Sequence, residues 1–213
     1  MTQNMEKLLP GVYRIRFGEP EKFSYAAFRE YPMLPFGKDC SAPFAAEDVV
    51  FQTTARGCSL SLPLDAQVFG FGLQLKAFNH TRAMRVMRNN ADAITPSGES
   101  HAPAPFYVTT QGYGVLVDSA RDVAFYCGQS KLRGASRANP FEFTENLSAS
   151  EAAYRRFLEK DRTEMLVDIP QAKGVDVYVF AGESMLEAVQ KYNMFSGGGA
   201  DLPEWALGVW YRM

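Results

Sequence analysis

Apolar and polar residues alternate along much of this chain, and a period of two predicts β-strands that bury one face. Residues 58–64 show the pattern, because Leu60, Leu62 and Leu64 alternate with two serines and a proline. Strands of this kind are expected at residues 12–17, 49–54, 58–64, 68–75, 122–127, 164–169 and 175–180, with a hairpin over 105–118. The pattern therefore predicts a mainly β protein.

Turn-forming residues between the strands predict which of them pair. The turn at residues 55–57 indicates a hairpin between the strands on either side of it, and Gly112 supplies the positive φ for a second tight hairpin. Residues 170–174 separate two further strands, at 164–169 and 175–180. We expect these two strands to pair with each other in antiparallel fashion.

One strand combines large aromatic side chains with glycine. Strict alternation places Phe69, Phe71 and Leu73 on one face and Gly70 and Gly72 on the other. Glycine at two consecutive positions of one face predicts that another backbone approaches this face closely.

Two segments have helical rather than strand periodicity. Residues 148–160 and residues 184–195 each begin with a serine three positions before a glutamate, which is the spacing of a capping box. In the second segment, Met185, Val189 and Tyr192 are predicted to share one buried face.

A glycine run ends the second helix and leads to an apolar segment at residues 202–210. Such an apolar segment is typical of a strand buried on both faces. We therefore expect two regions, a β-sandwich over residues 1–181 and a linker helix with an apolar strand over 182–213. This strand either begins a truncated second domain or packs on the sandwich or on a neighbouring molecule.

Composition and charge exclude several classes of protein. Among the 213 residues, 46% are apolar and 22% are charged, as in an ordinary globular protein, and the formal net charge is −2. Such a charge recruits neither nucleic acid nor an anionic membrane. The chain has three widely spaced cysteines and no apolar run long enough for a signal peptide or a membrane span. These features favour a soluble, cytoplasmic protein with three buried thiols.

Sites with a clear sequence motif are not expected. His80 and His101 lie too far apart for a structural zinc site, so no metal is expected. Ser100 and His101 are adjacent, but neighbours in a strand point to opposite faces and cannot share a hydrogen bond. Leu75 stands where a dinucleotide fingerprint needs its third glycine. We therefore expect no cofactor and assign no catalytic residue from motifs.

A long polar loop is the best candidate for function. Residues 88–103 are rich in turn formers and carry Asp92. Long loops of this kind are often functional, although a carboxylate there can also simply cap a turn.

The second half of the chain resembles glycoside hydrolase family 31, which includes α-glucosidases and α-xylosidases. The similarity starts with Val-Tyr-Val-Phe-Ala-Gly-Glu at 177–183, passes through a helix containing Tyr192, and ends with Leu-Pro-Glu-Trp-Ala-Leu-Gly-Val-Trp at 202–210. The chain departs from the family at Glu183 and Glu204, where proline is usual. Upstream, Val-Phe-Gly-Phe-Gly, Ala-Pro-Phe-Tyr-Val and Gly-Tyr-Gly-Val-Leu-Val-Asp follow the family's order, so the resemblance covers residues 68–210.

This resemblance implies a fold and an activity. The amino-terminal domain of the family is a galactose-mutarotase-like β-sandwich, followed by a (β/α)8 barrel whose first strand resembles residues 205–210. The family is retaining, and its two catalytic aspartates lie on later barrel strands. The chain is therefore expected to be inactive alone and to serve an α-glycosidase that acts on an α-linked carbohydrate, with a homo-oligomer possible.

The resemblance also gives the polar loop a role. In the family, one loop of the sandwich reaches over the barrel mouth and offers a carboxylate to the sugar, and the segment ending at Asp92 resembles that loop. Asp92 is accordingly the predicted substrate-binding residue.

Two other interpretations remain open from the sequence. A free-standing carbohydrate-binding module would use exposed aromatic platforms, for which many Phe and Tyr residues are available. A purely structural β-sandwich with an interaction role would need no site at all.

Overall fold

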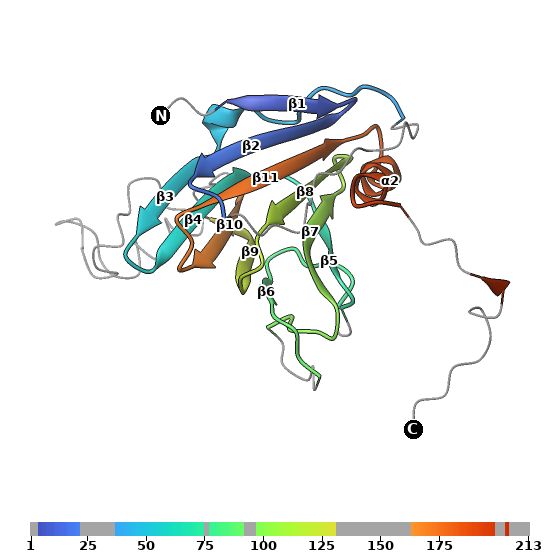
Figure 1. The fold of residues 1–213 in the computed structure, drawn as a ribbon. Helices are drawn as coiled ribbons and strands as arrows, with labels where there is room; N and C mark the ends of the chain where they lie inside the picture. The colour runs from blue at the N-terminus through green and yellow to red at the C-terminus, as the bar shows by residue number, and fades with distance from the viewer. Residues whose placement is uncertain are drawn as a thin grey trace, which may run out of the picture.

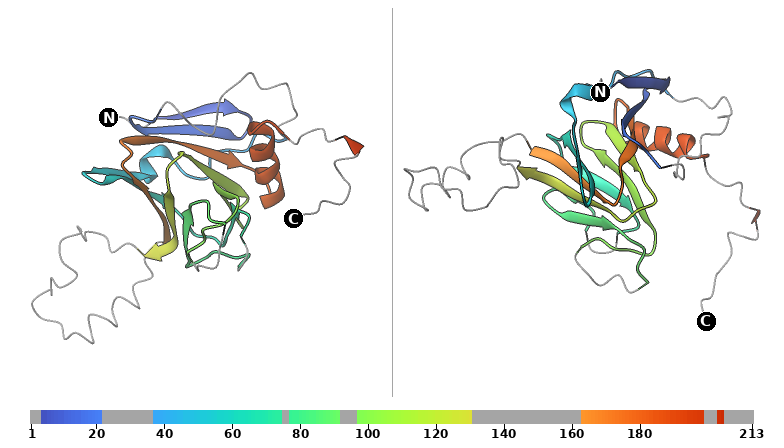
Figure 2. Two further views of the ribbon diagram at one scale, coloured as in Figure 1. Left: turned by 60° about the horizontal axis from the view of Figure 1, so that its bottom comes forward. Right: turned by 60° about the vertical axis from the view of Figure 1, so that its left-hand side comes forward.

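The computed structural model describes residues 4–21, 37–74, 77–91, 97–130, 163–198 and 203–204. Two antiparallel sheets pack face to face, and one helix lies against the outer face of the larger sheet (Figures 1 and 2). The predicted mainly β fold is confirmed. The predicted helix at 148–160, the apolar segment at 202–210 apart from residues 203 and 204, and Asp92 lie outside the described residues.

The larger sheet has six strands, and the smaller sheet has five. In spatial order, the six-stranded sheet consists of β1 (Met5–Leu9), β2 (Val12–Gly18), β11 (Gly174–Ala181), β8 (Tyr113–Asp118), β7 (Pro103–Thr109) and β5 (Val68–Gly72). The five-stranded sheet consists of β3 (Val50–Thr54), β4 (Gly57–Pro63), β10 (Thr163–Pro170), β9 (Val123–Ser130) and β6 (Met84–Met87). A short 3-10 turn, η1 (Ala46–Asp48), precedes β3, and α2 (Met185–Phe195) follows β11.

The hydrophobic core lies between the sheets. Alternating residues of each strand point inward, as Leu60 and Leu62 do from β4 and Val123 and Phe125 do from β9, and all four are at most 1% exposed. Burial of such a side chain contributes about 1.5–3 kcal/mol, so the period-two pattern supplies most of the driving force for sheet packing.

Both predicted hairpins are present. β3 pairs with β4 across a two-residue turn, and β7 pairs with β8 across a turn in which Gly112 has φ 82°. A side chain there would require a backbone conformation that L-residues rarely adopt.

The predicted pairing of the strands at 164–169 and 175–180 is wrong. β10 pairs with β4 and β9 in one sheet, whereas β11 pairs with β2 and β8 in the other. Between them, Gln171 has φ 60° and Ala172 is 4% exposed within the core, so the chain crosses from one sheet to the other here. Alternation predicts strands but carries no information about their partners.

The predicted faces of β5 are also partly wrong, because the strand is bulged. Its pairing with β7 shifts register between Gly70 and Gly72, and Phe71 has φ 64°. Phe71 therefore turns into the core, while Phe69 packs on the opposite side of the sheet and Leu73 is half exposed.

The predicted close approach to the β5 glycines is confirmed. A Cβ on Gly70 would lie 2.9 Å from the Phe106 carbonyl oxygen, and a Cβ on Gly72 would lie 2.2 Å from that of Ala102. The backbone of β7 occupies the space that a side chain would need.

The helix α2 begins where the sequence predicts. Ser184 is its N-cap, and its hydroxyl accepts the Glu187 backbone N–H. The Glu187 carboxylate accepts the N–H groups of Glu183 and Lys38, not that of Ser184, so the box is only partly formed.

The buried face of α2 differs from the predicted one. Ala188, Lys191 and Phe195 are buried, while Met185 and Val189 are exposed. Tyr192 does pack inward, stacking on Phe106 with ring centroids 3.8 Å apart and an interplanar angle of 6°. The helix is rotated from the predicted orientation because the aromatic side chains of the larger sheet select Tyr192 and Phe195 as partners.

Candidate functional site

The candidate site lies where β6 runs into the polar loop at one end of the five-stranded sheet. Asp92 itself lies outside the described residues, but the structure describes the loop up to residue 91 and again from residue 97. The two arms of this loop form a stem whose contacts can be traced.

Backbone hydrogen bonds hold the two arms of the stem together. The Val86 N–H donates to the Ser97 carbonyl over 2.8 Å, and the Asn90 N–H donates to the Ser100 carbonyl over 2.9 Å. The Ser100 N–H returns a bond of 3.2 Å to the Arg88 carbonyl. The ends of the loop are therefore fixed close to each other and to the sheet.

Side chains add a charged clamp to the same stem. The Arg88 guanidinium donates to Asp122 over 2.9 Å and to Glu99 over 3.1 Å. The Asn90 amide donates to the second oxygen of Glu99 over 2.9 Å. The hydrogen bond with Asp122, followed by its charge, raises the pKa of Arg88. Residues from the loop and from the β8–β9 connection thus share one network.

A buried cation supports the stem from the core side. Arg85 is 8% exposed, and its Nε donates to His80 Nδ1 over 2.8 Å. A Cβ on Gly98 would lie 2.4 Å from Arg85 Cδ, so the return arm of the stem packs directly on this arginine. Burial, and then the Arg85 charge, lower the pKa of His80 to about 4. Sequence reasoning missed this pair, because the short strand β6 that places Arg85 in the core was not predicted.

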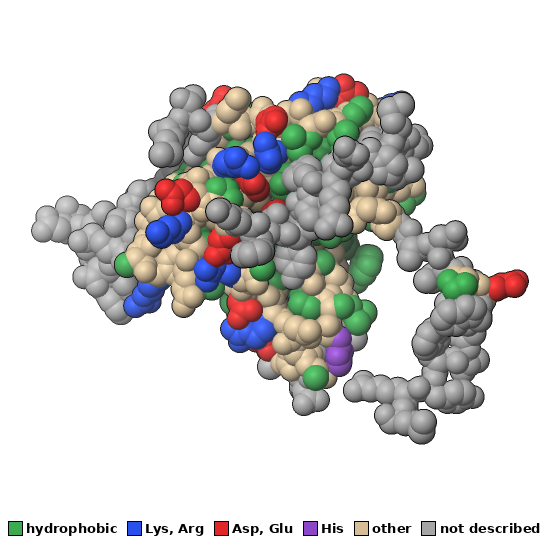
Figure 3. Space-filling model, viewed as in Figure 1, with side chains coloured by type: hydrophobic (Ala, Val, Ile, Leu, Met, Phe, Trp, Pro, Cys, Tyr) green, Lys and Arg blue, Asp and Glu red, His purple; other side chains and the backbone are tan. Residues whose placement is uncertain are grey.

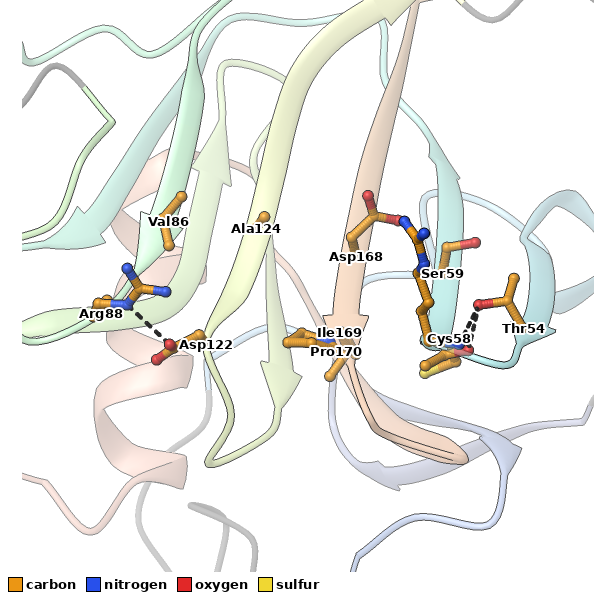
Figure 4. Close-up of a pocket in the computed structure, with 12 residues that line it drawn as sticks. Thr54, Cys58, Ser59, Val86, Arg88, Asp122, Ala124, Asp168, Ile169 and Pro170 are labelled. Atoms are coloured by element: carbon orange, nitrogen blue, oxygen red, sulfur yellow. Dashed lines mark hydrogen bonds and ion pairs between the residues drawn. The ribbon is translucent and has the colours of Figure 1, made fainter. Parts of the chain in front are cut away.

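An open groove adjoins the clamp on the outer face of the five-stranded sheet (Figure 4). Its volume is about 720 Å³, within the range of about 300–1,000 Å³ that small-molecule sites occupy. Arg88 and Asp122 form one end, Asp168 and Ser59 lie toward the other, and Ala124 lies between them (Figure 4).

The groove supports binding chemistry rather than nucleophilic chemistry. Its one thiol, Cys58, is 4% exposed, and burial raises the pKa of this thiol to about 11, so it stays protonated at neutral pH. Among the described residues, no three His, Cys, Asp or Glu side chains gather as a metal site requires.

The structure also shows how far the three cysteines and the adjacent residues Ser100 and His101 are buried. All three cysteines are free thiols, but only Cys58 and Cys127 are buried, whereas Cys40 is partly exposed. Ser100 is 1% exposed and His101 is exposed, so the two side chains do not face each other.

Surface charges and hydropathy add two observations. Acidic and basic side chains are interspersed on the face shown in Figure 3. Over the described part of the chain, no helix is long and apolar enough to cross a membrane.

Several curated proteins match the chain in sequence, among them an α-xylosidase and an isomaltosyltransferase. The α-xylosidase XylQ of Lactiplantibacillus pentosus is 24% identical over 151 residues, which cover 71% of this chain and 16% of that protein. The isomaltosyltransferase of Sporosarcina globispora is 25% identical over 155 residues, which cover 70% of this chain and 11% of that protein. No family model matches the chain.

Solved structures share the fold. A family 31 dextranase of Flavobacterium johnsoniae, crystallised with isomaltotriose, superposes on 97% of this chain with a TM-score of 0.52 and 17% identity. A cycloalternan-forming enzyme of Listeria monocytogenes, crystallised with a pentasaccharide, superposes on 97% with a TM-score of 0.54 and 12% identity.

The resemblance to the amino-terminal domain of glycoside hydrolase family 31 is confirmed. The chain spans only 22% and 21% of these two solved structures, and less of the curated relatives. The family 31 resemblance thus accounts for the sandwich and for the helix that follows it.

Proposed function

We propose that this chain is the amino-terminal β-sandwich domain of a retaining α-glycosidase. Residues 1–181 form the sandwich, and residues 182–213 lead into the catalytic barrel. The observation that carries the proposal is the sequence match to an α-xylosidase over 151 residues, combined with a shared fold over 97% of the chain. The carbohydrate complexes of two structural neighbours favour an α-linked oligosaccharide as the substrate.

The domain shapes the mouth of the active site through the loop that carries Asp92. A carboxylate at this position accepts hydrogen bonds from sugar hydroxyls, which orients the ring and excludes wrong sugars. The stem supports this role, because the Arg88–Glu99 clamp and the Arg85 side chain under Gly98 restrict where the loop can start and end. A fixed stem lowers the conformational cost of holding a loop over a substrate.

The chain contributes no catalytic carboxylate and is inactive alone. This part of the proposal rests on the family resemblance, in which both catalytic aspartates belong to later barrel strands.

The decisive experiment compares hydrolysis of a panel of aryl α-glycosides by the 213-residue chain and by the product of the complete reading frame that encodes it. We expect activity only in the longer protein. Hydrolysis by the 213-residue chain, or by neither protein, would contradict the proposal.

The role of Asp92 is tested in the active longer protein. Asp92→Asn should lower kcat/KM by about tenfold to a hundredfold, because an amide accepts fewer hydrogen bonds from sugar hydroxyls. Asp65→Asn is the matched control, since Asp65 is exposed on a different connection. Equal rates for Asp92→Asn and the control would remove Asp92 from the substrate site.

A further inference from the structure

A shallow trough crosses the outer face of the five-stranded sheet, perpendicular to its strands. Cross-strand pairing aligns five side chains in one row, in the order Gln52, Ser59, Asp168, Ala124 and Val86. Ser59 and Ala124 are short and flank Asp168, so the floor of the row is low on both sides of the carboxylate. Figure 4 shows Ala124 as a short stub between Val86 and Asp168.

The next row along the strands lies on the same face and is mainly apolar and aromatic, apart from the buried Ser61. It runs Val50, Ser61, Leu166, Tyr126 and Met84. Val50 and Met84 are 46% and 40% exposed, and Leu166 and Tyr126 are partly exposed. The neighbours of Tyr126 in β9 are core residues, so its ring belongs to the outer face.

The groove that overlaps the row of Asp168 carries charged side chains that balance. It is lined by two cations, Arg56 and Arg88, and by two anions, Asp122 and Asp168 itself. Equal numbers of both signs disfavour an anionic ligand such as a phosphate, and the mixture of donors and acceptors suits a neutral polyhydroxylated ligand.

The dimensions of the trough select an extended ligand. Five adjacent strands at about 4.8 Å spacing give a length of roughly 19 Å, which several pyranose rings in a row would occupy. Extended peptides are recognised chiefly at sheet edges, through backbone pairing, whereas this trough crosses the middle of the sheet.

From these observations we propose that the trough is a binding site for a neutral α-linked oligosaccharide. The ring of Tyr126 packs on the apolar face of a sugar, while Asp168 and Ser59 accept and donate hydrogen bonds to its hydroxyls. The choice of α-linked sugars rests on the proposed function, but binding itself requires no catalytic activity.

Calorimetric titration of the 213-residue chain with isomaltotriose, and separately with maltotriose, tests the proposal. We expect saturable binding below about 10 mM ligand. Tyr126→Ala should weaken binding about tenfold, and Ala124→Gln, which fills the trough with a polar side chain on an accessible strand face, should abolish it. Thermal unfolding checks that each variant is folded, and if Ala124→Gln is not, Tyr126→Ala carries the test.

A control separates the trough from other surfaces. Asp65→Asn, at an exposed position outside the trough, should leave the affinity unchanged, whereas Asp168→Asn should lower it. Amide chemical shifts should change at Ala124 and Tyr126 on titration. The absence of binding with both sugars, or binding that the trough variants do not alter, would overturn the proposal. Neither of these results would bear on whether the longer protein hydrolyses glycosides. The proposed function is therefore tested independently of the trough.

Discussion

Lys191 and His80 are titratable side chains that are buried, although the apolar pattern of the chain does not predict their burial. Lys191 is 1% exposed on α2, and its ammonium donates to the carbonyl oxygens of Lys38 and Ala181, each over 2.6 Å. It also lies 3.1 Å from the Glu187 carboxylate. A buried charge is tolerated only with such partners, so Lys191 ties the segment before η1 to the helix.

Replacing Lys191 with methionine should lower the free energy of unfolding by about 2–4 kcal/mol. The variant keeps most of the side-chain volume but removes the ammonium that donates to the carbonyl oxygens of Lys38 and Ala181 and that pairs with Glu187. Urea denaturation followed by circular dichroism measures the loss. Lys173→Met, at an exposed turn, is the control and should change stability little. Equal stability of the two variants would show that the lysine contacts are energetically unimportant.

His80 predicts a dependence of stability on pH. Its Nδ1 accepts a hydrogen bond from Arg85, so protonation there would place two cations together in the core. The folded pKa of about 4 lies below the usual 6.5, and the unfolded state therefore binds the proton first as pH falls. Stability from this residue is present above pH 6.5 and is lost toward pH 4, with a total of about 3 kcal/mol.

Unfolding free energies measured between pH 7 and pH 4 test this prediction. His80→Gln should flatten the dependence over that range, whereas His101→Gln, at an exposed position, should keep the wild-type slope. If the unfolding free energy of His80→Gln fell with pH as steeply as that of the wild type, other groups would control stability in acid.

At the scale of single elements, the bulge in β5 shows how backbone contacts override side-chain periodicity. Simple alternation would place Phe69 and Phe71 together, yet the shift at Gly70–Gly72 sends them to opposite faces. At both glycines of the bulge, the β7 backbone lies too close for a side chain.

Gly72→Ala should therefore destabilise the protein more than Gly197→Ala does. Both glycines have positive φ, of 74° and 106°, so both variants carry backbone strain of about 1–2 kcal/mol. Only at Gly72 does the new methyl group also meet a backbone oxygen, whereas no atom lies within 4 Å of a Cβ at Gly197. The additional loss should be about 1–3 kcal/mol, measured by thermal unfolding. A smaller effect at Gly72 would show that β7 can move aside.

At the scale of the whole molecule, one side remains apolar and exposed beside the packed helix. Met185, Leu186 and Val189 on α2 are 38%, 67% and 37% exposed, and Phe78 is 83% exposed and contacts Phe69. Phe69 in turn packs against the same aromatic cluster as the helix. Apolar surface of this kind favours association with another protein surface.

We expect the 213-residue chain to self-associate through this side at high concentration. Analytical ultracentrifugation should show an average mass that rises with concentration, and Leu186→Gln should reduce that rise. Val50→Gln is the control, because Val50 is 46% exposed but lies on the other sheet, and it should leave the rise in mass unchanged. A constant monomer mass for the unmodified chain would contradict this expectation.

The sequence by itself determined the elements whose causes are local. Alternation located most of the strands but not β1 and β6, Gly112 specified a tight turn, and Ser184 marked the start of α2. Each of these depends on side chains a few residues apart. Its motifs also indicated the resemblance to family 31 and predicted a role for the loop at residues 88–103. Asp92 in that loop lies outside the described residues.

Only the tertiary structure decided how these elements meet. It separated β10 from β11, turned Phe71 inward, and rotated α2 so that Lys191 is buried, because each outcome depends on backbone and side chains distant in sequence. The Arg85–His80 support and the trough around Asp168 likewise join residues from several strands. Periodicity gives each strand two faces, but only packing decides what each face contacts.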